Sequence, residues 1–476
     1  MRSLLVRTWL YAPPIATVLW TGHHWNKRKS SFFTRQQVAQ HVNKITGIWV
    51  TNGNNVYDIT DFVDGHPGGD KILLAAGKPL EPFWSIFTVH NNENVSSLLE
   101  QYRIGELNDD DKALPPVDMK ETMSELFPHE PERSEKLQIV SRHPFNAESS
   151  LEELGRTFIT PNDTFYVRNH LPVPEPVEEK DAELCINNEK KRKCFTIDEI
   201  KTMQSVAKTV TLQCAGNRRS QMNKEKKTLG LQWNKGAIGN AEWRGVSVKT
   251  LLDEMGWERE KGSHIEFVGR DSYAASVPME LVEKHDIVIA YQMNGEKLPI
   301  DHGSPLRAVV PGVVAARSVK WLSEINIRNM ESESPWQRHD YKVLPSSVEK
   351  PTVQDYESVP SIQETPVQSA ITNLSCEGGE CECSLTGYAF SGGGKEIYRL
   401  EISTDGGETW YDAEIKEKGI DGYSWTLWKK RLDKVHEGEN VICRATDSEG
   451  TVQPGNVKSI WNCRGLLNTA YDSCFC

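Results

Sequence analysis

The alternation of apolar and polar residues along the chain predicts strands in several separate regions. In the stretch TVTLQCAGNRR, Val210 and Leu212 alternate with polar neighbours, which is the period of a half-buried strand. Cys214 has the same parity as these two residues, so we expect its side chain to point inward at the strand end. Arg218 and Arg219 follow closely. Because guanidinium groups favour a thiolate, Cys214 is a candidate metal ligand or nucleophile, with a buried structural cysteine as the alternative.

The same alternation recurs on both sides of this strand. FYVRNHLPVP at 165–174 predicts a strand that runs into a proline-rich loop, and RSVKWLSEINI at 317–327 predicts a strand preceded by basic residues. After residue 345, the runs EIYRLEIST, ETWYDAEIKE, YSWTLWKKRL and NVICRATDS alternate and are separated by glycine turns, which is typical of a β-sandwich. Near the N-terminus, Asn52-Gly53 lies between IWV and VYDI, which predicts a β-hairpin.

Length and composition divide the chain into segments. A chain of 476 residues has room for two to four domains. The acidic, proline-containing stretch from Asn108 to Met123 shows neither helical nor strand periodicity, so we expect a flexible linker there. We therefore predict an α+β multidomain protein. Its segments are a leader at 1–34, an α+β module at 35–112, a linker at 113–124, a mixed α/β region at 125–345 and a β-sandwich at 346–476.

The first 34 residues resemble a mitochondrial presequence. They contain five Lys and Arg, and no Asp or Glu occurs before Asp58. A secretory signal is the alternative. The apolar stretch WLYAPPIATVLW has twelve residues and two prolines, which is short of the roughly 20 residues that span a bilayer. We therefore expect a targeting segment and no integral membrane span.

Charge and cysteine content disfavour several other classes of protein. The net charge of −12 argues against a general nucleic-acid binder, because no broad basic face for phosphates is present. The motif CxxCH does not occur, which excludes covalently attached haem. Two cysteine clusters match no zinc-binding spacing, so we expect unpaired thiols there rather than a metal site or a disulfide. These clusters are Cys376, Cys381 and Cys383, and Cys474 with Cys476.

The module at 35–112 carries a histidine pair in an apolar setting. His66 opens the sequence HPGG, and His90 follows 24 residues later, with a largely apolar stretch between them. Over some 75 residues this module resembles the cytochrome b5 family. The resemblance implies that His66 and His90 are the two axial ligands of a non-covalent haem b, which then passes single electrons. Six Lys and Arg against eleven Asp and Glu give residues 35–112 a net charge of −5, which suits a basic redox partner.

No histidine or carboxylate cluster of metal-binding spacing accompanies Cys214. One thiolate does not hold a catalytic metal by itself, because such sites normally have three or more protein ligands. Either the cysteine is inert or the metal arrives already chelated by a cofactor. Basic residues are spread through the same region, at Arg168, Arg307 and Lys320 among others. Together they suggest recognition of an anion, such as a phosphate group on that cofactor.

Four motifs are closely similar to the sulfite oxidase family and extend the match over nearly the whole chain: TVTLQCAGNRR, FYVRNHLPVP, DHGSPLRAVVPGVVAARSVKWL and VKSIWNCRG. The resemblance implies that Cys214 binds the molybdenum of a Mo-molybdopterin. It assigns to the pterin cofactor Tyr166, Val167, Arg168, Asn169, His170, Asp271, His302, Arg307, Ser318, Val319 and Lys320. It assigns to the anionic substrate pocket Arg168, Arg219, Trp233, Tyr341 and Arg464.

The resemblance also implies a function and a set of partners. We expect sulfite to be oxidised to sulfate in the mitochondrial intermembrane space, with electrons leaving through the haem to cytochrome c or oxygen. We expect the immunoglobulin-like C-terminal sandwich to form a homodimer. A nitrate-reductase-like enzyme is the first alternative, but it normally has its haem module after the molybdenum core. A non-enzymatic electron carrier is the second, and it predicts loss of Cys214, Arg168 or Tyr341, all of which are present.

Two features depart from the family pattern. Cys463 stands where an aliphatic residue is expected, and the chain ends in DSCFC. They concern the redox behaviour of the C-terminal region rather than the molybdenum assignment.

Overall fold

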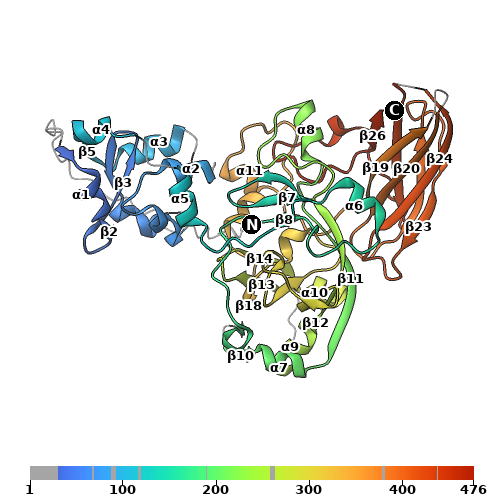
Figure 1. Ribbon diagram of the computed structural model, residues 1–476. Helices are drawn as coiled ribbons and strands as arrows, with labels where there is room; N and C mark the ends of the chain where they lie inside the picture. The colour runs from blue at the N-terminus through green and yellow to red at the C-terminus, as the bar shows by residue number, and fades with distance from the viewer. Residues whose placement is uncertain are drawn as a thin grey trace, which may run out of the picture. The chain divides into compact units, whose positions relative to one another are not determined.

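The computed structural model describes residues 31–475 except 67–68, 87–89, 91–92, 116–118, 189, 258–262, 378–380 and 437. The chain divides into two compact units, Met1–Val117 and Asp118–Cys476 (Figure 1). The targeting prediction falls on residues 1–34, of which 1–30 lie outside the described residues. Within the described part of the chain, no helix combines the length and apolar character needed to cross a membrane.

The first unit is built on a five-stranded sheet in the order β1-β5-β4-β3-β2. The predicted hairpin at Asn52-Gly53 is confirmed, because β3 and β4 pair up to Asn52 opposite Asn55. The strands are β1 (Ser31–Phe33), β2 (Val42–Asn43), β3 (Gly47–Asn52), β4 (Asn55–Asp58) and β5 (Arg103–Leu107). The helices are α1 (Arg35–Ala39), η1 (Thr60–Gly65), η2 (Gly69–Ala75), α2 (Glu81–Ile86), α3 (Glu93–Glu100) and α4 (Asp109–Ala113).

The segment expected to lack regular structure contains helix α4 and most of helix α5 (Met119–Leu126), so that expectation is wrong. The Asn108 side chain accepts a hydrogen bond from the Asp111 amide and caps α4. Three aspartates occupy the first turn and Lys112 the last, which complements the helix dipole. The acidic run that suggested a linker is therefore the signal of a short capped helix.

The second unit contains two five-stranded sheets, of which the first is mixed and the second antiparallel. One has the order β10-β9-β18-β13-β14, and the other β11-β12-β15-β16 with β17 beside β15. Their strands are β9 (Glu183–Asn187), β10 (Arg192–Thr196), β11 (Ser205–Gln213), β12 (Ile238–Ser247), β13 (His264–Gly269), β14 (Ala274–Pro278), β15 (Val288–Met293), β16 (Glu296–Lys297), β17 (Arg307–Val309) and β18 (Leu322–Arg328). The strands predicted before Cys214 and within 317–327 are thus confirmed as β11 and β18.

Helices and one smaller sheet complete this part of the unit. The helices are α6 (Leu151–Arg156), α7 (Ile197–Thr202), α8 (Arg219–Glu225), α9 (Val248–Met255), α10 (Met279–His285) and α11 (Val353–Glu357). The smaller sheet has the order β6-β7-β8, with β6 (Gln138–Ser141), β7 (Asn146–Glu148) and β8 (Val167–Arg168). A disulfide that the sequence interpretation missed joins Cys185 and Cys194, which lie opposite each other on β9 and β10.

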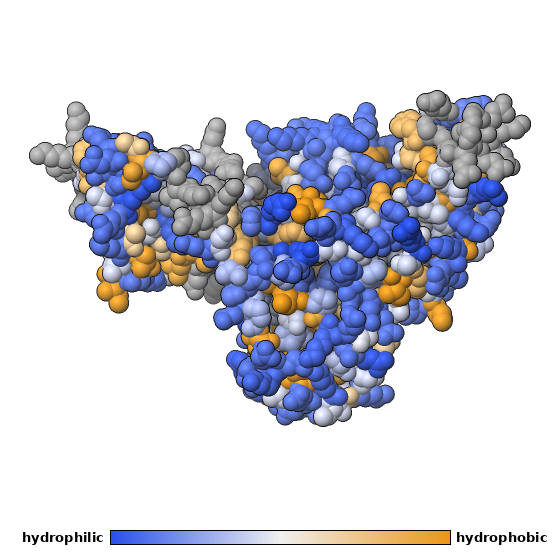
Figure 2. Space-filling view, in the orientation of Figure 1, coloured by the Kyte–Doolittle hydropathy of each residue, from blue (hydrophilic) through white to orange (hydrophobic). Residues whose placement is uncertain are grey.

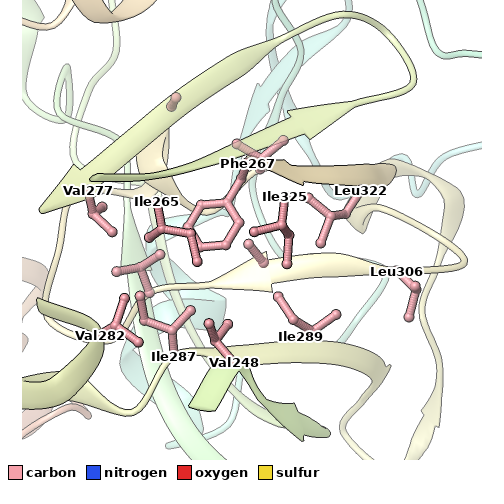
Figure 3. Close-up of a cluster of buried hydrophobic side chains, with 14 of the residues drawn as sticks. Val248, Ile265, Phe267, Val277, Val282, Ile287, Ile289, Leu306, Leu322 and Ile325 are labelled. Carbon is pink, nitrogen blue, oxygen red and sulfur yellow. The ribbon is translucent and has the colours of Figure 1, made fainter. Parts of the chain in front are cut away.

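The core of the mixed region packs the first sheet against elements of the second. In Figure 3, Phe267 of β13 and Ile325 of β18 belong to the same buried cluster as Val248 of α9 and Ile289 of β15. All four side chains are fully buried. The face shown in Figure 2 is mainly hydrophilic, with small scattered hydrophobic patches, so the apolar residues gather mostly inside.

The C-terminal part is a β-sandwich, as predicted. Its sheets have the orders β19-β20-β24-β23 and β22-β21-β25-β26, and Figure 1 shows the first as neighbouring ribbons. The strands are β19 (Gln368–Glu377), β20 (Cys381–Phe390), β21 (Ile397–Ser403), β22 (Tyr411–Asp412), β23 (Glu414–Lys418), β24 (Thr426–Val435), β25 (Asn440–Asp447) and β26 (Asp472–Phe475). Leu385 and Trp428 of one sheet share a buried cluster with Ile402 and Val441 of the other.

The cysteine prediction for this part is wrong at one position. Cys383 is disulfide-bonded, whereas unpaired thiols were expected. The strand register places Cys383 opposite Cys376 in β19 and β20. Cys474 forms no disulfide. The side chains of Cys376, Cys381 and Cys476 lie outside the described residues.

The core predicts a large stability effect at Phe267, which has no exposed surface. Phe267→Ala should lower the free energy of unfolding by about 3–5 kcal/mol, because it removes buried apolar surface and leaves a cavity. Ile420→Ala is the control, because Ile420 is 98% exposed and should change stability by no more than about 0.5 kcal/mol. Urea unfolding of the full chain measures both. Equal midpoints for the two variants would contradict this core.

Candidate active site

A cleft in the second unit lies where β11 ends and the chain turns at Cys214. Its other walls come from β8 and the residues around it, from the 3-10 helix η5 (Ile300–His302) and from residues 315–321. The space between the walls is about 670 Å³, including solvent at its mouth. The lining residues are Phe165, Tyr166, Arg168, Asn169, His170, Leu212, Cys214, Ala215, Asp271, Tyr273, Asp301, His302, Arg307, Ala315, Ala316, Ser318, Val319, Lys320, Trp321 and Tyr341.

Cys214 points into this cleft from the end of β11, as its parity predicted. The residue is only 5% exposed, and its thiol is in no disulfide. Its backbone N–H donates to the carbonyl of Ala237 at 3.0 Å. Its Sγ accepts the backbone N–H of Gly216 at 3.4 Å. The sulfur is therefore held in a fixed direction at the cleft wall.

The two arginines after Cys214 point in different directions. Arg218 has a left-handed backbone, with φ of 65°, and its side chain runs away from the cleft into the sandwich. Arg219 turns back towards the sulfur, where the charge of Cys214 partly offsets the lowering of the Arg219 pKa that burial causes. Only Arg219 therefore supplies positive charge on the side of Cys214.

Arg219 is held in place by backbone groups. It donates to the carbonyl oxygens of Leu231, at 2.7 Å, and of Arg464, at 2.9 Å. A Cβ at Gly216 or Gly230 would stand 2.7 Å from its guanidinium nitrogens, closer than real Cβ contacts allow. Glycine at these positions is therefore what lets the loops close around the guanidinium.

Burial of cations gives the cleft its electrostatic character. Burial lowers the pKa of Lys320 to about 7, of Arg307 to about 10 and of His302 to about 4. The guanidinium of Arg307 donates to the carbonyls of His302 and Ser318. Carbonyl partners satisfy hydrogen bonds but carry no full charge, so positive charge remains uncompensated in the cleft.

The carboxylate of Asp301 also lines the cleft, but its charge is largely committed elsewhere. Arg133 binds both of its oxygens, at 2.6 and 2.9 Å. Burial alone would raise the pKa of Asp301, but Arg133 and Lys320 hold it below its usual value. The Lys320 ammonium donates to the Asp301 carbonyl at 2.7 Å and also to the Asn169 side chain. The ammonium group is therefore fixed at the cleft wall.

Tyr341 lines the cleft, and Arg464 lies near its arginines. The hydroxyl of Tyr341 lies 2.7 Å from Nε2 of His170, and burial raises the pKa of Tyr341. Arg464 pairs with Asp340, and burial together with Arg219 and Arg168 lowers its pKa to about 10. Among the described residues, Nε of Arg464 is a buried N–H without a hydrogen-bond partner. That orphaned donor indicates a ligand that is itself an acceptor.

The structure brings most of the predicted site residues of this unit together. The lining includes Cys214, Arg168, Tyr341, Tyr166, Asn169, His170, Asp271, His302, Arg307, Ser318, Val319 and Lys320. Four predicted residues do not line it: Val167, Arg219, Trp233 and Arg464. Val167 packs in a separate apolar cluster, and Arg219 and Trp233 lie beside Gly216.

Sequence reasoning missed several lining residues. Tyr273 stacks on His170 with ring centres 4.6 Å apart, and Asp301 anchors Lys320. Trp321 follows directly after Lys320, and Phe165 directly precedes Tyr166. Asp301 and Trp321 lie next to residues that were predicted, so proximity in sequence was the available signal. Nothing local indicated the side-chain direction of Tyr273.

The residues of the cleft fit a pterin-chelated metal. The lining offers the thiol of Cys214 and three basic side chains, Arg168, Arg307 and Lys320, together with two carboxylates, Asp271 and Asp301. His302, Arg307 and Lys320 would hold anionic groups of such a cofactor, and Cys214 would bind its metal.

A second candidate metal centre lies in the first unit. The rings of His66 and His90 are parallel within 5°, and their centres are 6.0 Å apart. Two nitrogens bound to one metal ion at about 2 Å each lie about 4 Å apart, and the ring centres lie farther still. The observed spacing therefore fits one iron between the two imidazoles. Leu73 and Leu74 of η2, 39% and 44% exposed, offer apolar surface for a flat group.

Comparison with known families agrees with this division. Residues 34–108 match the cytochrome b5-like heme/steroid binding domain. Residues 170–336 match the oxidoreductase molybdopterin binding domain. Residues 359–474 match the Mo-co oxidoreductase dimerisation domain.

Individual relatives cover most of the chain. Mitochondrial sulfite oxidase of Rattus norvegicus is 43% identical over 460 residues, which is 92% of this chain and 83% of that protein. Mitochondrial sulfite oxidase of Homo sapiens is 42% identical over 94% of this chain and 84% of that protein. Among solved structures, the sulfane dehydrogenase SoxCD of Paracoccus pantotrophus has a TM-score of 0.61 at 26% identity, covering 78% of this chain and 92% of that one.

The low pKa of Lys320 predicts a pH-dependent cost to the cofactor-free fold. Between its folded pKa of about 7 and its unfolded value of about 10.4, the unfolded state binds more protons, so stability rises with pH across that window. Lys320→Met should remove this part of the slope and stabilise the cofactor-free chain, most of all below pH 7. Urea unfolding at pH 6, 8 and 9.5 measures it, with Lys297→Met, at a 79% exposed side chain, as the control. Parallel pH profiles for wild type and Lys320→Met would refute the prediction.

Proposed function

This chain belongs to the sulfite oxidase family, and from that premise we propose that it oxidises sulfite to sulfate and passes the electrons through its haem module to cytochrome c. The observation that supports this most directly is Cys214, placed in a buried cleft with excess positive charge. The same chain carries a parallel histidine pair suited to a haem. An oxidation site and an electron carrier therefore occur together.

The reaction takes one oxygen atom from water: sulfite and water give sulfate, two protons and two electrons. A molybdenum–pterin centre bound at Cys214 supplies the oxygen-atom transfer and accepts the electron pair. The protein supplies binding and orientation. Haem iron takes up one electron at a time, so each turnover needs two successive transfers.

Positive groups around the sulfur select an anion. Arg219 is fixed by carbonyls and cannot turn away, so it offers a permanent positive charge. Arg464 contributes its unpartnered Nε–H, from which an oxygen of sulfite can accept a hydrogen bond. Arg168 is anchored by Asn146 at 3.1 Å. Together the three guanidiniums would bind and orient sulfite.

Tyr341 supplies a neutral donor. Because burial raises its pKa, the hydroxyl keeps its proton at neutral pH and can hydrogen-bond a substrate oxygen. His170, 2.7 Å away, orients that hydroxyl. His302 stays uncharged near neutral pH because burial lowers its pKa to about 4, and its ring nitrogen lies 2.9 Å from the carbonyl of Asn162.

The acceptor, the compartment and the assembly are parts of the same proposal. The acidic haem module, with a net charge of −5 over residues 35–112, suits a basic acceptor such as cytochrome c. Relatives named mitochondrial and the basic leader support a mitochondrial location, which we place in the intermembrane space. The match to a dimerisation domain supports a homodimer through the sandwich.

Cys214→Ser tests the metal site directly. We expect the purified variant to keep its haem and to lose nearly all molybdenum, because one hydroxyl does not replace a thiolate as a soft ligand. Elemental analysis measures the molybdenum-to-iron ratio. Sulfite added without oxygen should reduce the haem of the wild type and then cytochrome c, but should leave the haem of the variant oxidised. Cys474→Ser serves as the control, because Cys474 forms no disulfide and lies outside the cleft. A variant with its full molybdenum content would contradict the assignment of Cys214.

Arg464→Met tests substrate binding. Removing a charge-assisted hydrogen bond of about 1.5–3 kcal/mol should raise KM for sulfite about 10- to 100-fold. Steady-state kinetics with cytochrome c gives KM and kcat. Arg399→Met, at a 53% exposed side chain of the sandwich, is the matched control and should leave KM unchanged. An unchanged KM in Arg464→Met would remove Arg464 from the substrate pocket.

A further inference from the structure

A buried carboxylate of the C-terminal strand is in contact with the loop that carries Cys214. Asp472 begins β26 of the sandwich and has no exposed surface. One of its oxygens lies 3.5 Å from Nη2 of Arg218, and the other lies 2.6 Å from Nζ of Lys235. Burial alone would raise the pKa of Asp472, but the two cations hold it below its usual value. An ionised carboxylate thus faces two positive charges.

The remaining hydrogen bonds of Asp472 show that the site is fully satisfied. Its Oδ1 accepts from the Gln221 side chain at 2.8 Å, and its Oδ2 accepts from the Ile371 backbone at 2.8 Å. Four donors therefore converge on two oxygens. If asparagine replaced Asp472, the N–H groups of its side-chain amide would face two of these donors and could not accept from them.

Arg218 connects Asp472 to the loop that carries Cys214. Its guanidinium also donates to the carbonyls of Ala470, at 2.8 Å, and Tyr471, at 3.1 Å. Its backbone carbonyl accepts from the Asn468 side chain at 2.9 Å. The positive φ of Arg218 is costly for a residue with a side chain, so these contacts maintain the turn four residues after Cys214.

Lys235 connects Asp472 to a second loop, which also contacts Cys214. This loop comprises residues 234–237, directly after Trp233. The carbonyl of Ala237 accepts the backbone N–H of Cys214 at 3.0 Å. The carbonyl of Asn234 accepts the backbone N–H of Arg218. The two loops are thus joined to each other and, through one carboxylate, to β26. The C-terminal segment adds a direct hydrogen bond, which Leu467 N–H donates to the carbonyl of Ala215 at 2.8 Å.

We propose that Asp472 is a positioning residue for the Cys214 thiolate, because its carboxylate holds Arg218 and Lys235 and thereby both loops that orient Cys214. The sandwich then has a second role besides assembly: it completes the support of the metal ligand. This inference rests on the proposed function, since it concerns how Cys214 keeps its metal.

The test compares Asp472→Asn with a core variant of the same sandwich. Supporting groups beyond the ligands typically change metal affinity 10- to 100-fold, so we expect molybdenum to dissociate from Asp472→Asn about tenfold faster or more. Release of molybdenum from the purified holoprotein into chelator-containing buffer, measured against iron, gives the rate. Leu385→Ala is the control, because it removes a fully buried side chain of the sandwich core without touching Asp472. It should lower the unfolding midpoint and keep the wild-type release rate.

Three outcomes would count against the inference. A wild-type release rate in Asp472→Asn overturns it, and so does equally fast release from Leu385→Ala, because the role of Asp472 would then be merely structural. Absence of molybdenum from the wild-type holoprotein overturns the proposed function and this inference with it. If Asp472→Asn does not fold, Arg218→Lys replaces it. A lysine keeps the charge but cannot bridge the carbonyls of Ala470 and Tyr471, and the same faster release is expected.

Discussion

Burial of basic side chains is the constraint on which the cleft depends. Lys320 and Arg307 are buried beside the cleft, and their hydrogen bonds go mainly to carbonyl oxygens. Such groups are costly in an empty site, because desolvation disfavours their charged forms. A cofactor or substrate with negative charge removes that cost when it binds. Affinity for anions is therefore a consequence of how the fold places its cations.

Backbone groups hold the charges in place. The guanidinium of Arg219 is surrounded by glycines and donates to carbonyls from two distant segments, one around Leu231 and one around Arg464. A rigid donor set loses little entropy when an anion binds, which favours tight and oriented binding. The same loops carry the thiolate, so the geometry of the metal ligand and that of the substrate pocket depend on one set of contacts.

The two units divide the chemistry of the proposed reaction. The cleft of the second unit is the proposed site of the two-electron oxidation. The parallel histidines of the first unit suit single-electron transfer. The sandwich belongs to the second unit and reaches the metal loop through Asp472. The orientation of Cys214 thus depends on contacts that the sandwich makes with its loop.

Local patterns determined much of this protein. Period-two alternation located β11 and the inward side of Cys214, the Asn-Gly pair located a hairpin, and family-specific motifs indicated most of the lining residues. The helix at Asp109–Ala113 was missed because its acidic residues act through a cap at Asn108 and the helix dipole rather than through periodicity. The family resemblance assigned Arg219 rather than Arg218 to the substrate pocket, but only the tertiary structure gives the physical reason. Arg218 finds its partners some 250 positions away, at Ala470 to Asp472, and long flexible side chains turn towards whatever partners folding brings near them.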